Sequence, residues 1–168
     1  TTNHILQKCY RTHGRRVARH NSVVNAIKRG LERKGCVVHV EPSLHCESGL
    51  NKPDLVAIRQ NHIYVIDAQV VTDGHSLDQA HQAKVERYDK EDIRSEMRRF
   101  FRTTGDIEFH SATLNWRGIW SGQSIKRLVT KDLLTTGDSN IISVRVVTGG
   151  VTSFKYFMHC CGYSRASA

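Results

Sequence analysis

Two aspartates in the middle of the chain have the residue type and the spacing for metal chemistry. Asp54 begins one strongly apolar segment and Asp67 lies in the next, with the polar pair Gln60-Asn61 between them. If this pair is the turn of a hairpin, Asp54 faces Asp67 and their Cβ atoms lie about 4.5–5.5 Å apart. Like charges at that distance repel, and a hard divalent cation such as Mg²⁺ removes the repulsion. The alternative is that both are ordinary solvent-exposed strand ends.

Three further polar residues follow at positions that would place them near the two aspartates. Gln69 lies two residues after Asp67 and therefore on the same side of the strand. Lys84 and Tyr88 share one face of the next predicted helix, which also carries apolar residues and so faces the sheet. A lysine there either extends its ammonium to the surface or is held by a nearby carboxylate pair.

The elements that must position these residues can be inferred from hydrophobic periodicity. Apolar spacings of three and four predict a helix over about 16–34, ended by Gly35. A short strand at 37–40 follows, then a loop at 43–53, then the hairpin of 54–59 and 62–71. A polar lead-in precedes the first helix.

The second half of the chain is predicted to be mostly helical. Ser76-Leu-Asp-Gln79 has the pattern of a capping box, and a long helix runs from there to about Phe101. A strand at 107–114 and a third helix from Ser121 to about 134, ended near Gly137, follow. The tail from Asn140 allows either strands or two short helices around Gly149-Gly150. The order predicts an α/β domain with a small mixed sheet flanked by helices.

Composition indicates one globular domain with an anionic partner. The 168 residues are 39% hydrophobic and carry 25 Lys and Arg against 16 Asp and Glu, a net charge of +9. Such a domain attracts polyanions, of which nucleic acid is the commonest, although a basic protein without such a partner fits the charge too. The five cysteines form no regular disulfide framework, which favours a reducing compartment. No apolar run has the length of a membrane helix, so we expect no membrane partner.

Several short motifs occur together in this order. The chain contains half of a CCHC zinc knuckle, a basic and polar triplet, a strand-ending acid, a Pro-Asp motif followed by a second acid, and a Lys–Tyr pair at helical spacing: His4 with Cys9, Arg19-His20-Asn21, Glu41, Lys52-Pro53-Asp54 with Asp67, and Lys84 with Tyr88. From His4 to Trp120 the set resembles the restriction-like, PD-(D/E)XK endonuclease region of site-specific non-LTR retrotransposon polyproteins.

The resemblance implies a fold, an activity and partners. The fold would be a restriction-endonuclease-like core at 15–168, preceded by a knuckle remnant and lead-in at 1–14. The activity would be nicking of double-stranded target DNA, whose liberated 3′-hydroxyl primes reverse transcription. Element RNA and a reverse transcriptase domain of the longer polyprotein would be partners, and the site of action would be the nucleus.

The resemblance also implies roles for the site residues. Asp54 and Asp67 would bind Mg²⁺ or Mn²⁺ with the main-chain carbonyl of Ala68, and Lys84 would be the catalytic lysine. Restriction enzymes have lysine two residues after the second acid, and here Gln69 stands there, so the lysine function would come from the helix. Accessory and DNA-contacting roles fall to a second group: His20, Glu41 and Gln69 as accessory residues, and Arg15, Arg16, Arg19, Asn21 and Tyr88 as DNA contacts.

Several of these assignments have alternatives. His20 lies on the inner helix face and could equally be a satisfied buried histidine, and Glu41 could pair with a cation instead of assisting the metal. His4 and Cys9 cannot make a four-ligand site, so we expect no zinc here. For the whole chain, the rival functions are a Holliday-junction-resolvase-like nuclease and a catalytically decayed, basic DNA-binding module. A structural RNA-binding domain has little support, because aromatic residues are few.

Overall fold

The computed structural model describes residues 1–74 and 76–161. Its elements alternate irregularly between helix and strand, and their bounds are these: α1 Thr2–Gln7, the 3₁₀ helix η1 Tyr10–Thr12, α2 His13–Arg33, β1 Val37–Val40, β2 Leu44–Cys46, β3 Gly49–Asn51, β4 Leu55–Arg59, β5 His62–Val71, α3 Leu77–Tyr88, α4 Glu91–Phe101, β6 Ile107–Asn115, α5 Gly122–Thr130 and α6 Thr136–Cys160.

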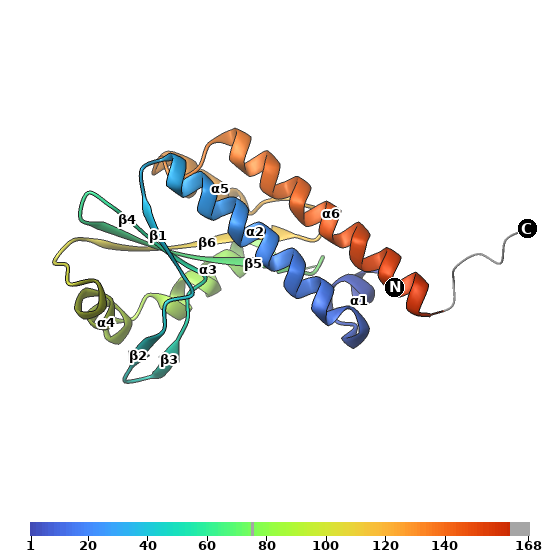
Figure 1. Ribbon diagram of the computed structural model, residues 1–168, viewed down its shortest axis with the longest axis horizontal. Coiled ribbons are helices and arrows are strands. Elements are labelled where there is room, and N and C mark those ends of the chain that lie inside the picture. The colour runs from blue at the N-terminus through green and yellow to red at the C-terminus, as the bar shows by residue number, and fades with distance from the viewer. Residues whose placement is uncertain (75, 162–168) are drawn as a thin grey trace, which may run out of the picture.

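A four-stranded mixed sheet in the order β1-β4-β5-β6 forms the centre of the molecule. The first three strands pair antiparallel and β6 pairs parallel to β5. Helices α2, α5 and α6 cover one face of the sheet, and α3 and α4 cover the other (Figure 1). The prediction of a small mixed sheet between helices is therefore confirmed, and two separate apolar cores lie on its two sides.

The hairpin of β4 and β5 has the predicted register. Gln60 and Asn61 both have positive φ, 50° and 63°, which is the conformation of a two-residue turn whose twist matches that of the strands. Arg59 consequently pairs with His62, and the ladder extends to Leu55 opposite Ile66. One further step along the same register brings Asp54 beside Asp67.

Two predicted boundaries were wrong in the middle of the chain. Residues 43–53 are not a plain loop, because β2 and β3 form a small antiparallel hairpin whose Leu44 is fully buried against α4. The long helix predicted up to Phe101 is interrupted at Asp89-Lys90, where Lys90 is extended. The Asp89 carboxylate accepts a hydrogen bond from Arg94, so the break is stabilised by a local polar contact rather than by proline or glycine.

The C-terminal prediction was also wrong. The third helix ends at Thr130 rather than near 134, and Gly137 lies in the first turn of α6 instead of ending a helix. A capping box between Thr135 and Asp138 starts α6, which then runs without interruption through Gly149-Gly150 to Cys160. Over residues 140–161, neither strands nor two short helices form.

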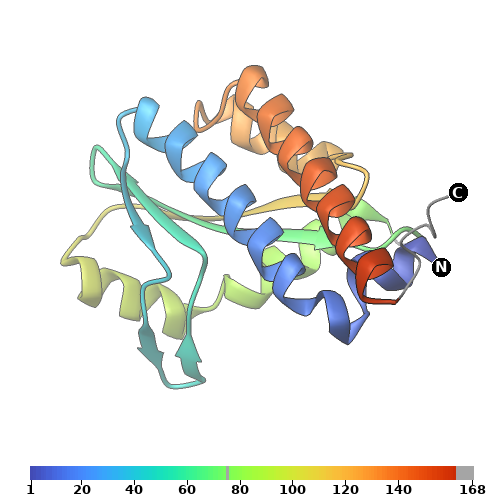
Figure 2. The same ribbon diagram turned by 45° about the vertical axis from the view of Figure 1, so that its right-hand side comes forward.

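Glycines at the contact between α2 and α6 explain why a glycine pair lies inside the longest helix. A Cβ at Gly149 would lie 2.6 Å from Cγ of Arg19, and one at Gly30 would collide with Leu134. These positions let the two helices pack closely side by side, as both ribbon views show (Figures 1 and 2). Among the described residues, no helix combines the length and apolar character needed to cross a membrane.

Candidate active site

Asp54 and Asp67 lie together at one end of the β4–β5 hairpin. The backbone N–H of Asp54 donates to the Asp67 carboxylate at 3.3 Å, and the N–H of Ala68 donates to Asp54 Oδ2 at 2.7 Å. Each carboxylate is thus tied to the main chain of the opposite segment. Asp67 is 4% exposed, so neither residue is an ordinary exposed strand end, and both are held by the strand register.

Lys84 supplies the positive charge beside this pair. Its Nζ lies 2.5 Å from Asp67 Oδ2, and its side chain is mostly buried. The lysine on the sheet-facing side of α3 therefore does not extend to the surface but pairs with the second acid. Tyr88, one turn later, is buried, with its ring centroid 5.9 Å from the Lys84 ammonium and its hydroxyl 3.5 Å from the carbonyl of Lys52.

His20 reaches the same pair from the opposite side of the sheet edge. It lies on α2, and its Nε2 is 3.1 Å from Oδ1 of Asp54. The sequence left open whether this histidine is a satisfied inner residue or part of the site. The structure makes it half-buried and in direct contact with one of the two acids. Two cationic or proton-bearing side chains, His20 and Lys84, therefore flank the two carboxylates.

Glu41 lies at the end of the neighbouring strand, in the same row as the two aspartates. Val40 pairs with Leu55, and the N–H of Glu41 donates to the carbonyl of Asp54 at 3.0 Å. Glu41 has φ of 47°, a conformation that few residues other than glycine adopt, and its side chain is exposed. Three adjacent chain segments thus contribute one acid each to this edge.

Burial and charge alter the protonation of these groups. Burial, together with the Asp54 carboxylate, raises the pKa of Asp67, and Lys84 opposes that rise. The hydrogen bond to Asp54 raises the pKa of His20. Burial raises the pKa of the Tyr88 hydroxyl, so this group remains a neutral donor. An acid that is costly to ionise beside a second acid is the situation that a bound cation relieves.

The oxygen ligands at this site suit a hard cation, although protein side chains alone would not complete its coordination shell. Among residues 1–74 and 76–161, no group of three or more His, Cys, Asp or Glu side chains is arranged to hold a metal. Two carboxylates and a nearby main-chain carbonyl at Ala68 are nevertheless the oxygen ligands that Mg²⁺ takes, with water or phosphate completing its shell. The residues present therefore fit Mg²⁺ or Mn²⁺ better than zinc.

Gln69 and Arg19 do not reach the acid pair. The Gln69 amide donates to the carbonyl of Ala80 and to Thr113 Oγ1, so it joins β5 to α3 and β6. The DNA contact predicted for Arg19 stays a prediction, and in the structure this side chain is 4% exposed. Its guanidinium donates to Leu6 O and to the side chain of Gln7, and so fastens α1 to α2.

The remaining predicted residues lie away from the acid pair. Arg16 donates to the carbonyl of Cys9 at 2.6 Å and holds the turn before α2, whereas Arg15 and Asn21 are exposed on that helix. His4 is exposed on α1 and Cys9 is buried beside it, with the Cys9 N–H bonded to the carbonyl of His4. The segment that contains His4 and Cys9 thus packs against the rest of the protein.

The main-chain amides that hold the acids were not foreseen from the sequence. Asp54 N–H and Ala68 N–H each bond to the carboxylate across the hairpin. No residue type encodes such a contact, because every non-proline residue has an N–H. The only signal is the hairpin register itself, which places these amides opposite the acids once the turn length is known.

Comparison with known proteins adds the biological context of this geometry. The chain is 73% identical over 165 residues to part of the retrovirus-related Pol polyprotein of the type-2 retrotransposable element R2DM of Drosophila melanogaster. It is 30% identical over 166 residues to that of the type-1 element R2 of Nasonia vitripennis, and 28% identical over 166 residues to one from Popillia japonica. The homologues of this chain are R2 non-LTR retrotransposon Pol polyproteins.

These alignments cover nearly all of this chain but a small part of each polyprotein. They span 98% and 94% of the chain for the Drosophila and Nasonia proteins, and only 16% and 15% of those proteins' lengths. No protein-family model matches the chain. A crystal structure of a protein of unknown function aligns with 80% of this chain and 97% of its own, with TM-score 0.31 and 12% identity, which supports no argument about the fold.

Proposed function

We propose that residues 15–168 are a metal-dependent DNA endonuclease domain with a restriction-endonuclease-like core. One observation carries the proposal: Asp54 and Asp67, on adjacent antiparallel segments, are held together by main-chain amides while Lys84 pairs with Asp67. Folding alone gives no reason to place two carboxylates side by side at a largely buried sheet edge. A divalent cation with a positive side chain beside it can together stabilise the charge that develops when a phosphodiester is hydrolysed.

Each residue of the site has a task in this proposal. Mg²⁺ or Mn²⁺, when bound, supplies Lewis-acid stabilisation of the scissile phosphate. Asp54 and Asp67 bind it with the carbonyl of Ala68, and their orientation is fixed by the hairpin amides. Lys84 moves its ammonium from Asp67 toward the phosphate and stabilises the negative charge that develops during attack.

The neighbouring side chains position the site or the DNA. His20 donates to Asp54 and holds the orientation of that carboxylate. Tyr88 stays protonated and restricts the Lys84 side chain, and its hydroxyl is available as a donor to a phosphate oxygen. Glu41 continues the acidic row and holds a water molecule at the edge. Asn21 and Arg15, predicted as DNA contacts, are exposed on α2 and line the surface between α2 and α6, so they are given no role at the cleaved strand.

The similarity to R2 Pol polyproteins gives the proposed reaction a purpose. A nick in double-stranded target DNA exposes a 3′-hydroxyl, and a reverse transcriptase elsewhere in the polyprotein extends it on the element's RNA. Target DNA, element RNA and the reverse transcriptase domain are therefore the proposed partners, and the nucleus is the proposed place of action. Most of the polyprotein lies outside this chain, so choice of the target site is not assigned to it.

Plasmid nicking with Mg²⁺ tests the proposal. Asp67→Ala and Asp67→Asn should both abolish conversion of supercoiled to open-circular DNA, because neither provides a charged ligand. Glu86→Gln, an exposed acid of α3, is the matched control and should nick as the parent does. Undiminished nicking by both Asp67 variants would refute the assignment. Faster cleavage of a four-way junction than of a linear duplex would instead indicate a resolvase, and binding without cleavage a decayed nuclease.

A further inference from the structure

A continuous groove runs along the outer surface between α2 and α6. It consists of three adjoining hollows of about 460, 180 and 290 Å³. The first two share Ala18, Ser22 and Arg145 in their linings, and the second and third share Arg15 and Ala18. Since neighbouring hollows have common walls, they form one feature rather than three. We call it the α2/α6 groove.

Small side chains produce the floor of this groove. Ala18, Ser22, Thr148 and Thr152 lie along the contact between the helices, where Gly149 lets them approach closely. Larger residues at these positions would fill the space between the helices. The floor therefore offers hydroxyl groups and methyl groups but no deep apolar pocket, which suits an extended polar ligand rather than a compact apolar one.

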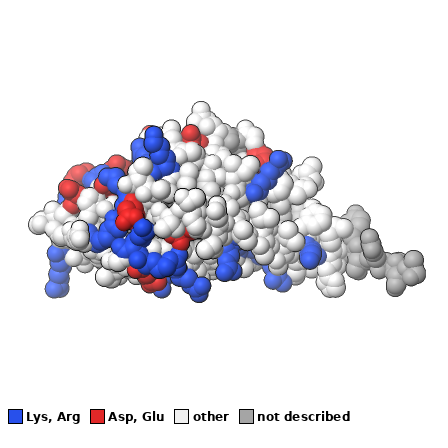
Figure 3. Space-filling view, turned by 90° about the horizontal axis from the view of Figure 1, so that it is seen from above, with Lys and Arg blue, Asp and Glu red and all other residues white. Residues whose placement is uncertain are grey.

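The walls of the groove are strongly basic. Arginines recur along its whole length, at Arg11, Arg15, Arg29, Arg33 and Arg145. Its one acidic lining residue among the described part of the chain is Asp138, which is buried and paired with Arg33. Arg29 and Arg145 are exposed and have no acidic partner within residues 1–74 and 76–161. Figure 3, which views the molecule from this side, shows Lys and Arg gathered toward one end together with some Asp and Glu, and isolated Lys and Arg farther along.

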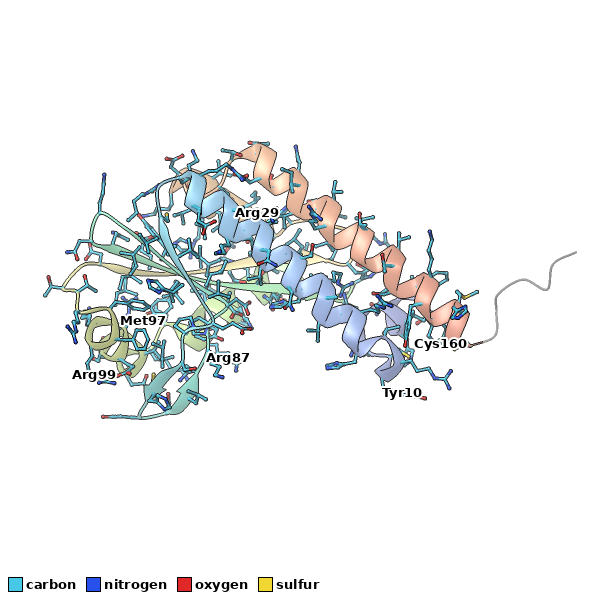
Figure 4. The ribbon with its side chains drawn as sticks, viewed as in Figure 1. Tyr10, Arg29, Arg87, Met97, Arg99 and Cys160 are labelled. Atoms are coloured by element: carbon cyan, nitrogen blue, oxygen red, sulfur yellow. The ribbon has the colours of Figure 1, made fainter. Side chains whose placement is uncertain are left out.

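The groove faces away from the acid pair. Nine residues separate His20, which contacts Asp54, from Arg29, and at 100° per residue they project from opposite sides of α2. Figure 4 shows Arg29 on the side of α2 next to α6, with Tyr10 and Cys160 at the far end of the two helices. A strand in the groove is therefore not the strand at Asp54 and Asp67, and the groove is a separate binding surface.

We propose that the α2/α6 groove binds a single nucleic-acid strand through its phosphates. From Arg15 to Arg33 the groove follows α2 for about 27 Å, which presents a row of cations to a row of anions. Arginine binds phosphate with two parallel hydrogen bonds, which a carboxylate-poor, hydroxyl-lined groove leaves free to form. Packed helices lie about 8–10 Å apart, so the groove between α2 and α6 is narrower than a nucleic-acid duplex.

Recognition in the groove is expected to ignore base identity. Among the described lining residues the aromatic one is Tyr156, and Arg15 already stacks on that ring at 4.7 Å. Without free rings, bases have no stacking platform, and phosphates alone determine affinity. DNA and RNA strands of one sequence should therefore bind similarly.

Salt-dependent binding to a labelled single-stranded DNA of about 20 nucleotides, in EDTA, tests the groove. Each phosphate contact on a single strand contributes about 0.7 to the slope of log K against log salt. Arg29→Ala combined with Arg145→Ala should lower that slope by about 1.4 and weaken binding. Arg29→Lys with Arg145→Lys should retain the slope, because the charge stays. Lys126→Ala removes an exposed cation on α5 outside the groove and should leave the slope unchanged.

The possible results distinguish strand binding in the groove from binding of an acidic protein segment, and they test the groove independently of the proposed nuclease activity. An unchanged slope in the double alanine variant, with a melting temperature like the parent's, would overturn it. Displacement of the strand by polyglutamate at equal charge concentration would assign the groove to an acidic protein segment instead. A strong preference for RNA over DNA would contradict recognition by phosphates alone. Asp67→Ala should keep this binding in EDTA whatever its effect on nicking, so the two proposals fail independently.

Discussion

The sheet edge around Asp67 and the α2/α6 groove both gather charge, but they do so in opposite ways. At the edge, Lys84 and His20 each contact one carboxylate, and the side chains are largely buried. In the groove the exposed charges are all positive, and Arg29 and Arg145 have no acidic partner among the described residues. Buried charges of alternating sign fix a geometry, whereas exposed charges of one sign attract a partner without fixing its position.

The difference predicts how each region responds to substitution. Removing one partner at the edge leaves a buried charge uncompensated and disturbs every neighbour, so effects should be large and coupled. Removing one charge on the outer surface should cost little and should depend on salt. The four predictions that follow test this contrast, beginning with the largest effect.

Lys84→Ala should reduce the nicking rate by about 10²–10³-fold. The variant lacks the positioned cation that stabilises the negative charge developing in the transition state. The rate under saturating DNA measures this effect. Lys84→Arg should recover part of the rate, since the charge returns with a different shape. If Lys84→Ala nicks at the parental rate, the lysine serves only to neutralise Asp67, and the buried pair is structural.

Acidic pH should destabilise the fold through buried histidines. Burial lowers the pKa of His110 to about 4, against 6.5 for an unperturbed side chain. Between these values the unfolded state binds more protons, so stability is complete above 6.5 and is lost as pH falls toward 4. The loss from His110 should reach about 3 kcal/mol, and His81, whose pKa burial also lowers, adds to it.

Urea unfolding at several pH values measures this loss. His110→Asn should flatten the dependence of unfolding free energy on pH in this range, whereas His39→Asn, at an exposed position, should leave it unchanged. An equally steep dependence in His110→Asn would show that the protons bind elsewhere.

Close packing of α2 on α6 should make a single methyl group costly. Gly149→Ala places a Cβ against the base of the buried Arg19 side chain, and the strain should exceed the gain in helix propensity. We expect a net loss of about 1–2 kcal/mol in unfolding free energy. Gly14→Ala, in the first turn of α2 with open space around it, should instead stabilise by about 0.5–1 kcal/mol. Equal signs for the two variants would contradict the packing argument.

The exposed pair of Lys28 and Glu32 should matter least. It is an i,i+4 pair at 3.3 Å on the outer part of α2. Glu32→Gln should cost about 0.3–0.5 kcal/mol at low salt and nothing measurable at about 1 M salt. A loss as large as that of Gly149→Ala would show that exposure does not decide the value of a charge in this protein.

The elements that were predicted correctly from the sequence are those determined by residues close together in the chain. Gln60-Asn61 between two apolar strands determined a turn length, and the turn length determined the register that brings Asp54 to Asp67. The sheet-facing stripe of α3 left two outcomes open for Lys84, and its contact with Asp67 decides between them. Period and turn chemistry act within a few residues, so one sequence is enough to read them.

The elements that it missed depend on distant contacts. The β-branched residues after Asn140 favour strands locally, but α6 forms because its capping box and its packing on α2 outweigh that preference. Arg19 was expected to meet DNA, yet α1 folds over it. The packing of α6 on α2 and the contacts of Arg19 lie beyond the reach of a helix or strand period, whereas the capping box at Thr135 is a local pattern that could have been read from the sequence.

The two-residue turn at Gln60-Asn61 has a consequence for how this domain tolerates change in length. Surface turns commonly accept insertions, because they carry no packing. Here one added residue would shift the pairing by a single step, and side chains in a strand alternate between faces. Asp54 and Asp67 would then point to opposite sides of the sheet with every functional side chain still present. The hairpin tip, which contacts no substrate in the proposed mechanism, would be as intolerant of insertion as the acids are of substitution.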